Sequence, residues 1–241
     1  MYNDFSAYAV ELYCGEMRSG KTLSIVADTL EDLKKTRNKK VGIFANFHVK
    51  PEFFKICGVD KKYYNIIKKI DLALYYEKKA EFTHCIFLID EFQTWLDSRN
   101  FMKGVEVPTD KLDKDGEQKT KKINYNQCVS YFLGQMGKRG NVLRGSVHDI
   151  NTIDVRGRLY TQKETYCFKG LIDNRGIWKQ MLNVNRICSE DENERMYIQK
   201  ITYIKKLVKT SFLPMFKYVQ LPTEYIKAKD YFALYDTMEL I

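Results

Sequence analysis

The chain has 241 residues, of which 44% are hydrophobic, and a formal charge of +9. This length and composition fit one large α/β domain with a sizeable core, or one domain with a small addition. The basic surplus permits nucleic acid or another polyanion as a partner, although a lysine-rich solvated surface explains it equally well. No signal peptide opens the chain and no apolar run is long enough to cross a bilayer, so we expect a protein that is not secreted and has no membrane span.

The first half of the chain alternates predicted strands with predicted helices. Residues 7–14 are typical of a strand, and residues 23–33 repeat apolar side chains at helical spacing. Residues 41–47 are predicted to form a second strand, and residues 53–77 are mostly helical in pattern. Residues 85–89 are a continuous apolar run, which is typical of a buried parallel strand.

The pattern becomes weaker in the second half. Residues 103–122 are rich in Gly, Pro, Asp, Lys and Thr, and we predict a mobile loop there. A helical stripe at 129–136 is followed by a strand at 141–147 and a short helical or irregular segment at 150–159. Beyond residue 160 we predict strands at 164–168 and 196–203, a turn at 172–176 and a capped helix at 223–238.

The alternation of strands and helices predicts the fold class. We expect an α/β fold with a mostly parallel sheet and helices on both faces, formed by residues 1–160. Residues 161–241 are predicted to be a small C-terminal extension, with strands and a terminal helix packed on this core.

The six cysteines stand far apart and form no C-x-x-C pair. Metal centres and redox motifs need close pairs, so the sequence indicates neither. Cys14 and Cys85 fall inside predicted strands, which suits buried thiols in a reducing compartment.

Residues 15–22 match the pattern G-x-x-x-x-G-K-[ST] of a phosphate-binding loop (P-loop) at every position. They are Gly15, Glu16, Met17, Arg18, Ser19, Gly20, Lys21 and Thr22. Glycines allow consecutive backbone N–H groups to face a phosphate, and the helix that follows adds its positive end. Lys21 would contact the β- and γ-phosphates, and the Thr22 hydroxyl would ligate Mg²⁺. We therefore predict a site for ATP, or a related nucleoside triphosphate, with Mg²⁺; the alternative is a glycine turn beside a surface lysine.

Two carboxylates end the apolar run at 85–89. Asp90 and Glu91 follow it directly, and the carboxyl ends of strands in open α/β sheets face the ligand crevice. Asp90 would complete the Mg²⁺ shell, and Glu91 would orient or deprotonate the attacking water. The alternative is that both residues only cap a following helix. A glutamate directly after the aspartate favours hydrolysis over the phosphoryl transfer of a small kinase.

The motifs resemble those of the FtsK/HerA superfamily of ring-forming, DNA-pumping P-loop ATPases with a RecA/FtsK-like fold. The likeness is strongest to the genome-packaging ATPases of membrane-containing archaeal and bacterial viruses and to Zot-like phage assembly ATPases. It is carried by the sequence of residues 15–22, by 88–92 with 97–99, by 138–140 and by Asp154-x-Arg156-x-Arg158. It covers residues 10–159 well and the last eighty residues poorly.

The resemblance implies two further site residues, and this chain departs from the family at both. The family places a polar sensor, most often Gln, at the end of the fourth core strand, where this chain has His148. A neutral imidazole can still bind a γ-phosphate or water, and a partly buried structural histidine is the alternative. The family's arginine finger lies shortly before that strand. Arg139 is the preferred candidate because a guanidinium spans two phosphate oxygens. The remaining candidates are Lys138, Arg99, Arg156 and Arg158.

The resemblance also implies what the protein acts on. We expect a homo-oligomeric ring, commonly a hexamer, because a finger supplied by a neighbour completes each site. The expected activity is ATP-driven translocation of double-stranded DNA, held non-specifically by its phosphates, into a preformed viral capsid. Capsid or inner-membrane proteins of a virion would be further partners, and the location would be the host cytoplasm or the packaging vertex of a virion.

Alternatives remain open at this stage. A Zot-like assembly or export ATPase would act on protein or single-stranded DNA. A small-molecule kinase would need an arginine-bearing lid and an acceptor site, which the sequence does not show. The loop at 103–122 would line the pore of a ring or be a passive insertion. The 17 Tyr and 14 Phe are spread through the chain, and we expect them in core and interfaces rather than in base-stacking platforms.

Overall fold

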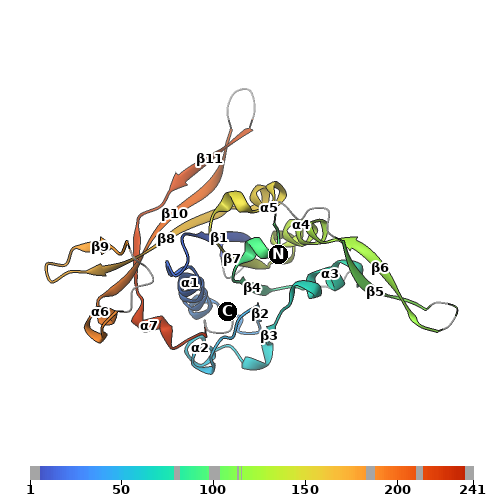
Figure 1. The fold of residues 1–241 in the computed structure, drawn as a ribbon, viewed down its shortest axis with the longest axis horizontal. Coiled ribbons are helices and arrows are strands. Elements are labelled where there is room, and N and C mark those ends of the chain that lie inside the picture. Colours follow the sequence, from blue (N-terminus) through green and yellow to red (C-terminus); the bar gives the residue numbers. More distant parts are fainter. Residues whose placement is uncertain are drawn as a thin grey trace.

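The structure is a computed structural model that describes residues 6–78, 82–97, 104–112, 114, 116–182, 188–209 and 214–236. Its centre is a large mixed sheet with the strand order β11-β10-β8-β1-β7-β4-β2-β3 (Figure 1). Six neighbouring strands run parallel. They are β8 (Lys163–Ile172), β1 (Val10–Cys14), β7 (Val142–Val147), β4 (Cys85–Ile89), β2 (Gly42–Ala45) and β3 (Tyr64–Ile66).

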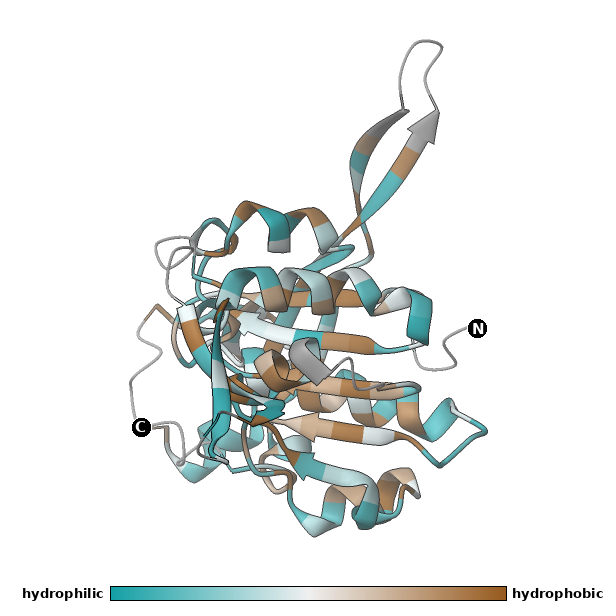
Figure 2. Cartoon of the chain, turned by 90° about the vertical axis from the view of Figure 1, so that its right-hand side faces the viewer, coloured by the Kyte–Doolittle hydropathy of each residue, from teal (hydrophilic) through white to brown (hydrophobic). Residues whose placement is uncertain are grey.

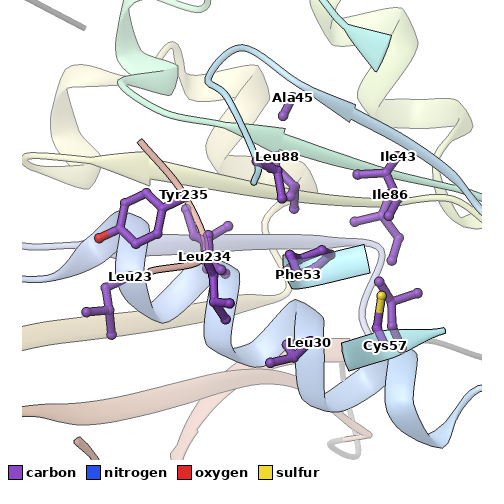
Figure 3. Packing of buried hydrophobic residues seen from close by; sticks show 14 of the residues in the cluster. Leu23, Leu30, Ile43, Ala45, Phe53, Cys57, Ile86, Leu88, Leu234 and Tyr235 are labelled. Atoms are coloured by element: carbon purple, nitrogen blue, oxygen red, sulfur yellow. The ribbon is translucent and has the colours of Figure 1, made fainter. Parts of the chain in front are cut away.

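Helices cover both faces of the parallel part. One face packs against α1 (Lys21–Lys35) and α2 (Pro51–Cys57). Figure 3 shows Leu30 of α1 and Phe53 of α2 on the side of the sheet toward which Leu88 of β4 points. The other face packs against α3 (Lys69–Lys78) and α4 (Tyr125–Gln135). The predicted α/β fold is confirmed. Among the described residues, no helix is long and apolar enough to cross a membrane.

The C-terminal residues extend the same sheet. Strand β8 lies parallel to β1, and β10 (Met196–Lys209) pairs antiparallel with β8. Strand β10 then pairs with β11 (Pro214–Gln220) and β12 (Glu224–Lys227), and β9 (Trp178–Gln180) pairs with β8. Two short helices follow β9 and β12, α6 (Glu190–Glu194) and α7 (Lys229–Phe232). The boundary at residue 160 stays a prediction, since the sheet runs from β1 into β8 by direct strand pairing.

The prediction of a loop at 103–122 is wrong. These residues form an antiparallel hairpin of β5 (Gly104–Leu112) and β6 (Gln118–Asn124). Only the base of the hairpin is apolar: Val107 and Ile123 are buried with Ala73 of α3 and Cys128 of α4. Two buried residues in such a polar segment give too weak an alternation to read as strands, although Asp115-Gly116 is a turn dipeptide. Gly116 has φ +81°, which the turn requires.

Two predicted helices are also wrong in part. Residues 53–77 divide into α2, the short strand β3 and α3, because Gly58 ends α2 in the left-handed region with φ 72°. Residues 223–238 contain β12 and the four-residue α7 instead of one helix. Tertiary pairing decides the second case, since Tyr225 and Ile226 lie opposite Gln199 and Ile198 of β10.

Two hairpins project from the body on different sides (Figure 1). One is β5–β6, and the other is formed by the ends of β10 and β11. Figure 2 shows one hairpin standing clear of the helices, with alternating hydrophilic and hydrophobic bands. We call the described residues of the β10–β11 projection, 201–209 and 214–220, the C-terminal arm.

Candidate functional site

The P-loop connects β1 to α1 at the carboxyl edge of the sheet. Its backbone needs glycine at both ends: Gly15 has φ +147° and Gly20 has φ +96°. A Cβ on Gly15 would lie 2.7 Å from the Cys167 carbonyl oxygen, and one on Gly20 would lie 2.4 Å from Ile198 Cδ1. Strands β8 and β10 therefore pack directly against this loop. The first N–H groups of α1, which begins at Lys21, have no partner within the helix and supply the positive end that a phosphate needs.

Lys21 is almost fully buried at the base of this loop, with 5% of its surface exposed. Its Nζ donates to the carbonyl oxygens of Gly15 at 3.0 Å and Glu16 at 2.7 Å. Burial lowers the pKa of Lys21, and the carboxylates of Glu91 and Asp90 oppose that effect. The ammonium group is thus pre-positioned beside two acidic side chains.

Asp90 is held by side chains from two neighbouring strands. The Ser146 hydroxyl of β7 donates to its carboxylate. Asn46, directly after β2, accepts from the Asp90 N–H at 2.7 Å and donates to the Asp90 carbonyl at 2.8 Å. Sequence reasoning missed both partners, and their only signal is a polar residue at or near the end of a predicted strand.

Glu91 begins a short turn of helix and has an unusual backbone. Its φ is 53°, in the left-handed region where non-glycine residues are uncommon. His148 Nε2 lies 3.0 Å from Glu91 Oε2, and the Gln93 side-chain amide donates to the same oxygen. His148 Nδ1 lies 3.4 Å from Lys21 Nζ. An ammonium can only donate, so Nδ1 accepts and Nε2 carries the proton shared with Glu91.

Gln93 was missed from the sequence. Its Oε1 is buried and has no hydrogen-bond partner among the described residues, while its Nε2 binds Glu91. A buried, unpaired acceptor beside a carboxylate is suited to receive a hydrogen bond from a water molecule. Its only sequence signal is its position two residues after Glu91.

The P-loop and the acidic strand end supply donors of the kind that a magnesium nucleotide needs. Thr22 is half-buried in the first turn of α1, and Asp90 is 6% exposed at the end of β4. The Ser19 hydroxyl in the loop is buried and has no partner in the described part of the chain. That same part holds no cluster of three His, Cys, Asp or Glu side chains that would bind a metal alone. The residues therefore fit Mg²⁺ that arrives with phosphate oxygens, since this ion keeps few protein ligands.

The basic candidates for a finger lie in different places. Arg139 ends a 3₁₀ turn before β7, and its guanidinium lies 5.7 Å from the centre of the Tyr75 ring. The six residues of β7 separate it from His148, roughly 20 Å along the strand. Lys138 is exposed beside Arg139. Arg99 lies outside the described residues.

Arg156 and Arg158 follow His148 in α5 (Val155–Tyr160). Arg156 Nε pairs with the Asp154 carboxylate at 2.8 Å, and Asp154 also caps this helix. This hydrogen bond holds the pKa of Asp154 below its usual value. Arg158 donates to the Asn151 side chain at 3.2 Å. The structure thus brings Lys21, Asp90, Glu91 and His148 together and leaves Arg139 at the opposite edge of the sheet.

A second set of charges lies between α1 and the sheet, and we call it the buried ionic cluster. Arg144, 1% exposed on β7, pairs with Glu11 on β1 at 3.4 Å and with Asp32 of α1. Lys163 and Lys200 pair with Glu11 at 3.0 Å and with Asp28 at 2.6 Å, respectively. Lys200 also pairs with the exposed Glu224 at 2.7 Å. Apart from Glu224, the cluster comprises three carboxylates and three cations. They are Glu11, Asp28, Asp32, Arg144, Lys163 and Lys200.

The buried ionic cluster strongly perturbs its own members. Burial raises the pKa of Glu11, but Arg144 and Lys163 outweigh it and lower that pKa to about 2. Each cation faces a carboxylate, so the cluster has no charge left to attract a ligand. No pattern in the sequence groups these six residues.

Comparisons with known proteins give similar structures and no matching sequences. No protein-family model matches the chain, and no curated protein matches it. A similar solved structure is the N-terminal domain of zonular occludens toxin from Neisseria meningitidis, with 12% identity and a TM-score of 0.47, covering 96% of this chain and 100% of that one. Another is the genome packaging NTPase B204 from Sulfolobus turreted icosahedral virus 2.

That NTPase was solved with several ligands. Its complex with AMP has 11% identity and a TM-score of 0.44, covering 83% of this chain and 93% of that one. Its complex with ATP-gammaS has 13% identity and the same TM-score of 0.44, covering 85% and 94%. Zonular occludens toxin and the genome packaging NTPases are named among the groups that the sequence motifs resemble.

Proposed function

We propose that this protein is a Mg²⁺-dependent ATPase that drives a DNA-translocating motor. The observation that carries the proposal is the chain of contacts from Lys21 through His148 to Glu91, directly beside the P-loop. It joins the group that binds the γ-phosphate to the group that activates water, and a nucleotide switch without hydrolysis has no need of that connection.

The P-loop binds the triphosphate. Backbone N–H groups at the start of α1 face the phosphates, and Lys21 exchanges the carbonyl oxygens of Gly15 and Glu16 for the β- and γ-phosphate oxygens. Thr22 and Asp90 hold Mg²⁺, which neutralises charge on the phosphates when it is bound. Ser146 and Asn46 keep the Asp90 carboxylate and backbone in place.

Glu91 acts as the base in hydrolysis. It accepts a proton from the water that attacks the γ-phosphorus, so the P–O bond to the leaving ADP breaks as the new P–O bond forms. His148 and Gln93 bind the same Glu91 oxygen and fix its orientation. The unpaired Oε1 of Gln93 accepts the second hydrogen of this water.

Arg139 acts on a neighbouring subunit in this proposal. It lies at the opposite edge of the sheet from its own P-loop, so it can reach a γ-phosphate only in another copy of the chain. A homo-oligomeric ring places that edge of one subunit against the nucleotide of the next. Residues 1–160 would form the ATPase core of each subunit, and residues 161–241 an extension of its sheet.

Double-stranded DNA is the proposed substrate of the motor, which would package it into a preformed capsid. The net charge of +9 suits a partner held through its phosphates without base reading. The motifs at 15–22 and 88–92 resemble those of genome-packaging ATPases, and B204 is a genome packaging NTPase. The Zot-like alternative would act on protein or single-stranded DNA.

ATP hydrolysis measured with and without linear duplex DNA tests the proposal. We expect Mg²⁺-dependent turnover that rises with DNA, and loss of ATP retention in Lys21→Ala. Lys34→Ala is the matched control, because Lys34 lies on the same helix and only pairs with Glu31 at the surface. ATP retention by Lys21→Ala equal to that of the parent would remove the P-loop from the mechanism. A rate of hydrolysis that does not change with duplex DNA would contradict the proposed duplex motor but not the proposed ATPase activity.

A further inference from the structure

The C-terminal strands present an aromatic face to solvent. Residues that pair across strands share a face, and here Ile201 lies opposite Tyr166 and Lys205 opposite Tyr218. A hollow of about 440 Å³ opens on this face. It is lined by Glu164, Tyr166, Phe168, Ile201, Tyr203 and Tyr218.

The aromatic face continues outward along the arm. Leu207 lies opposite Phe216, and these side chains are 56% and 61% exposed. Tyr218 is 49% exposed. The opposite face of the same strands is buried against the core, where the hydroxyls of Thr165 and Thr202 lie 3.1 Å apart. One face of these strands therefore builds the fold, and the other leaves large rings open to solvent, which marks a binding surface.

The C-terminal arm has a net positive charge, whereas the β5–β6 hairpin has none. Residues 201–220 contain four lysines and no Asp or Glu, whereas residues 104–124 contain five lysines and five acidic residues. Lys205 lies on the aromatic face, with its Nζ 4.5 Å from the centre of the Phe216 ring. Rings interleaved with cations suit a polyanion that also carries flat, apolar groups.

We propose that the C-terminal arm and the hollow at its base bind single-stranded nucleic acid. Unpaired bases would stack on Phe216, Tyr218 and Tyr203, and Lys205, on the same face, would contact the phosphates. Base pairs in a duplex hide their flat faces inside the stack, so rings on an open sheet favour a single strand. The proposal goes beyond the duplex motor, because it assigns a surface for unpaired bases.

Glu164 gives the hollow a hydrogen-bond acceptor. Its carboxylate receives the hydroxyls of Tyr218 and Tyr166, and burial raises its pKa. A carboxylate at the floor of an aromatic hollow is placed to accept from the amino groups of cytosine, adenine or guanine. Phosphates would stay outside, near the lysines.

The binding surface and the P-loop share two strands. Strand β10 carries Ile198 against Gly20, and β8 carries the Cys167 carbonyl against Gly15. The same strands carry Tyr203 and Tyr166 on the aromatic face. A nucleic acid bound to the arm would therefore contact the same two strands that pack against the P-loop.

Fluorescence anisotropy of a labelled 20-nucleotide oligo(dT) and of a 20-base-pair duplex, without ATP, tests the proposal on the full chain. We expect the single strand to bind more tightly than the duplex. Replacing both exposed rings, Phe216→Ala with Tyr218→Ala, should weaken oligo(dT) binding by about 10- to 100-fold. Phe216→Tyr with Tyr218→Phe keeps two stacking rings and should bind as the parent does.

Charge variants separate stacking from phosphate contacts. Lys205→Gln should weaken binding and make it less sensitive to salt, by about one in the log–log slope for the phosphate that the lysine no longer neutralises. The matched control is Lys122→Gln on β6, which should leave binding unchanged. ATP retention is measured on every variant, so failure of the ATPase proposal is seen independently of oligonucleotide binding.

Three results would overturn the proposal. The first is equal oligo(dT) affinity for the parent and the ring-to-alanine variant. The second is tighter binding to the duplex than to the single strand. The third is a ring-to-alanine variant that changes only the oligomeric state in sizing experiments, which would assign the face to a second copy of the chain.

Discussion

Helix α1 contacts two groups of charged side chains that differ in how they are paired. At its start, Lys21 lies beside Asp90, Glu91 and His148, with Glu91 34% exposed and a buried acceptor on Gln93 left unpaired among the described residues. Further along, Asp28 and Asp32 join the buried ionic cluster, in which each cation meets a carboxylate. Both groups lie at the same sheet.

A functional site can be distinguished from a structural group of charged residues by whether its polar atoms can change partners. The buried ionic cluster is closed, because each cation lies within ion-pair distance of a carboxylate and Arg144 and Glu11 are almost completely buried. The P-loop site is open, because its amides, Lys21 and Gln93 can exchange their present contacts for those of a ligand. The first group should govern stability and the second should govern turnover, and each of the following variants tests that separation.

Glu91→Gln should have the largest effect, and only on turnover. Removing the base should lower ATP hydrolysis by about 100- to 10,000-fold, with ATP retention and thermal stability unchanged. Steady-state hydrolysis, ATP binding and a thermal melt measure the three quantities. Unchanged turnover would remove Glu91 from the mechanism.

Arg144→Met should affect stability instead. It leaves the buried Glu11 with Lys163 as its remaining cation and takes from Asp32 its partner Arg144, which should lower the free energy of unfolding by about 3–5 kcal/mol. Urea unfolding measures the loss. Lys34→Ala breaks an exposed pair with Glu31 on the same helix and should cost at most about 0.5 kcal/mol. Equal losses in the two variants would contradict the distinction between the groups.

Acid should weaken the buried ionic cluster through Glu11. Its pKa falls from 4.5 to about 2 on folding, so its carboxylate stabilises the fold above pH 4.5 and loses that effect as the pH falls toward 2. The contribution is about 3 kcal/mol. Unfolding free energies at pH 7, 4.5 and 3 should fall less steeply in Glu11→Gln than in the parent. Parallel curves would show that Glu11 does not titrate in this range.

His148 should show the smallest effect of the four. His148→Ala removes the contacts to Lys21 and Glu91 and should lower kcat by about 10- to 100-fold, with little change in KM. His148→Gln can both accept and donate, and it should recover most of the activity. A uniform loss of stability in both variants would make His148 a structural residue.

Features that depend on neighbouring residues could be predicted from the amino-acid sequence. The P-loop is read from eight consecutive positions, and Asp90 and Glu91 from their place at the end of an apolar run. The predicted strands at 85–89 and 141–147 match β4 and β7 closely. For β4 the reason is that a continuous apolar run of this length is typical of a strand buried on both faces of a sheet.

Features that depend on pairing between distant segments could not be predicted, because they arise only in the folded chain. The β5–β6 hairpin has only a small buried base, so its strands exist because Val107 and Ile123 meet α3 and α4. Asn46 contacts Asp90 only because the ends of β2 and β4 meet in the sheet. The aromatic face of the arm came from the register of β8, β10 and β11, since period-two side chains share a face only after strands pair. Motifs made of consecutive residues can therefore be predicted from the sequence, whereas binding surfaces depend on contacts that form only when the chain folds.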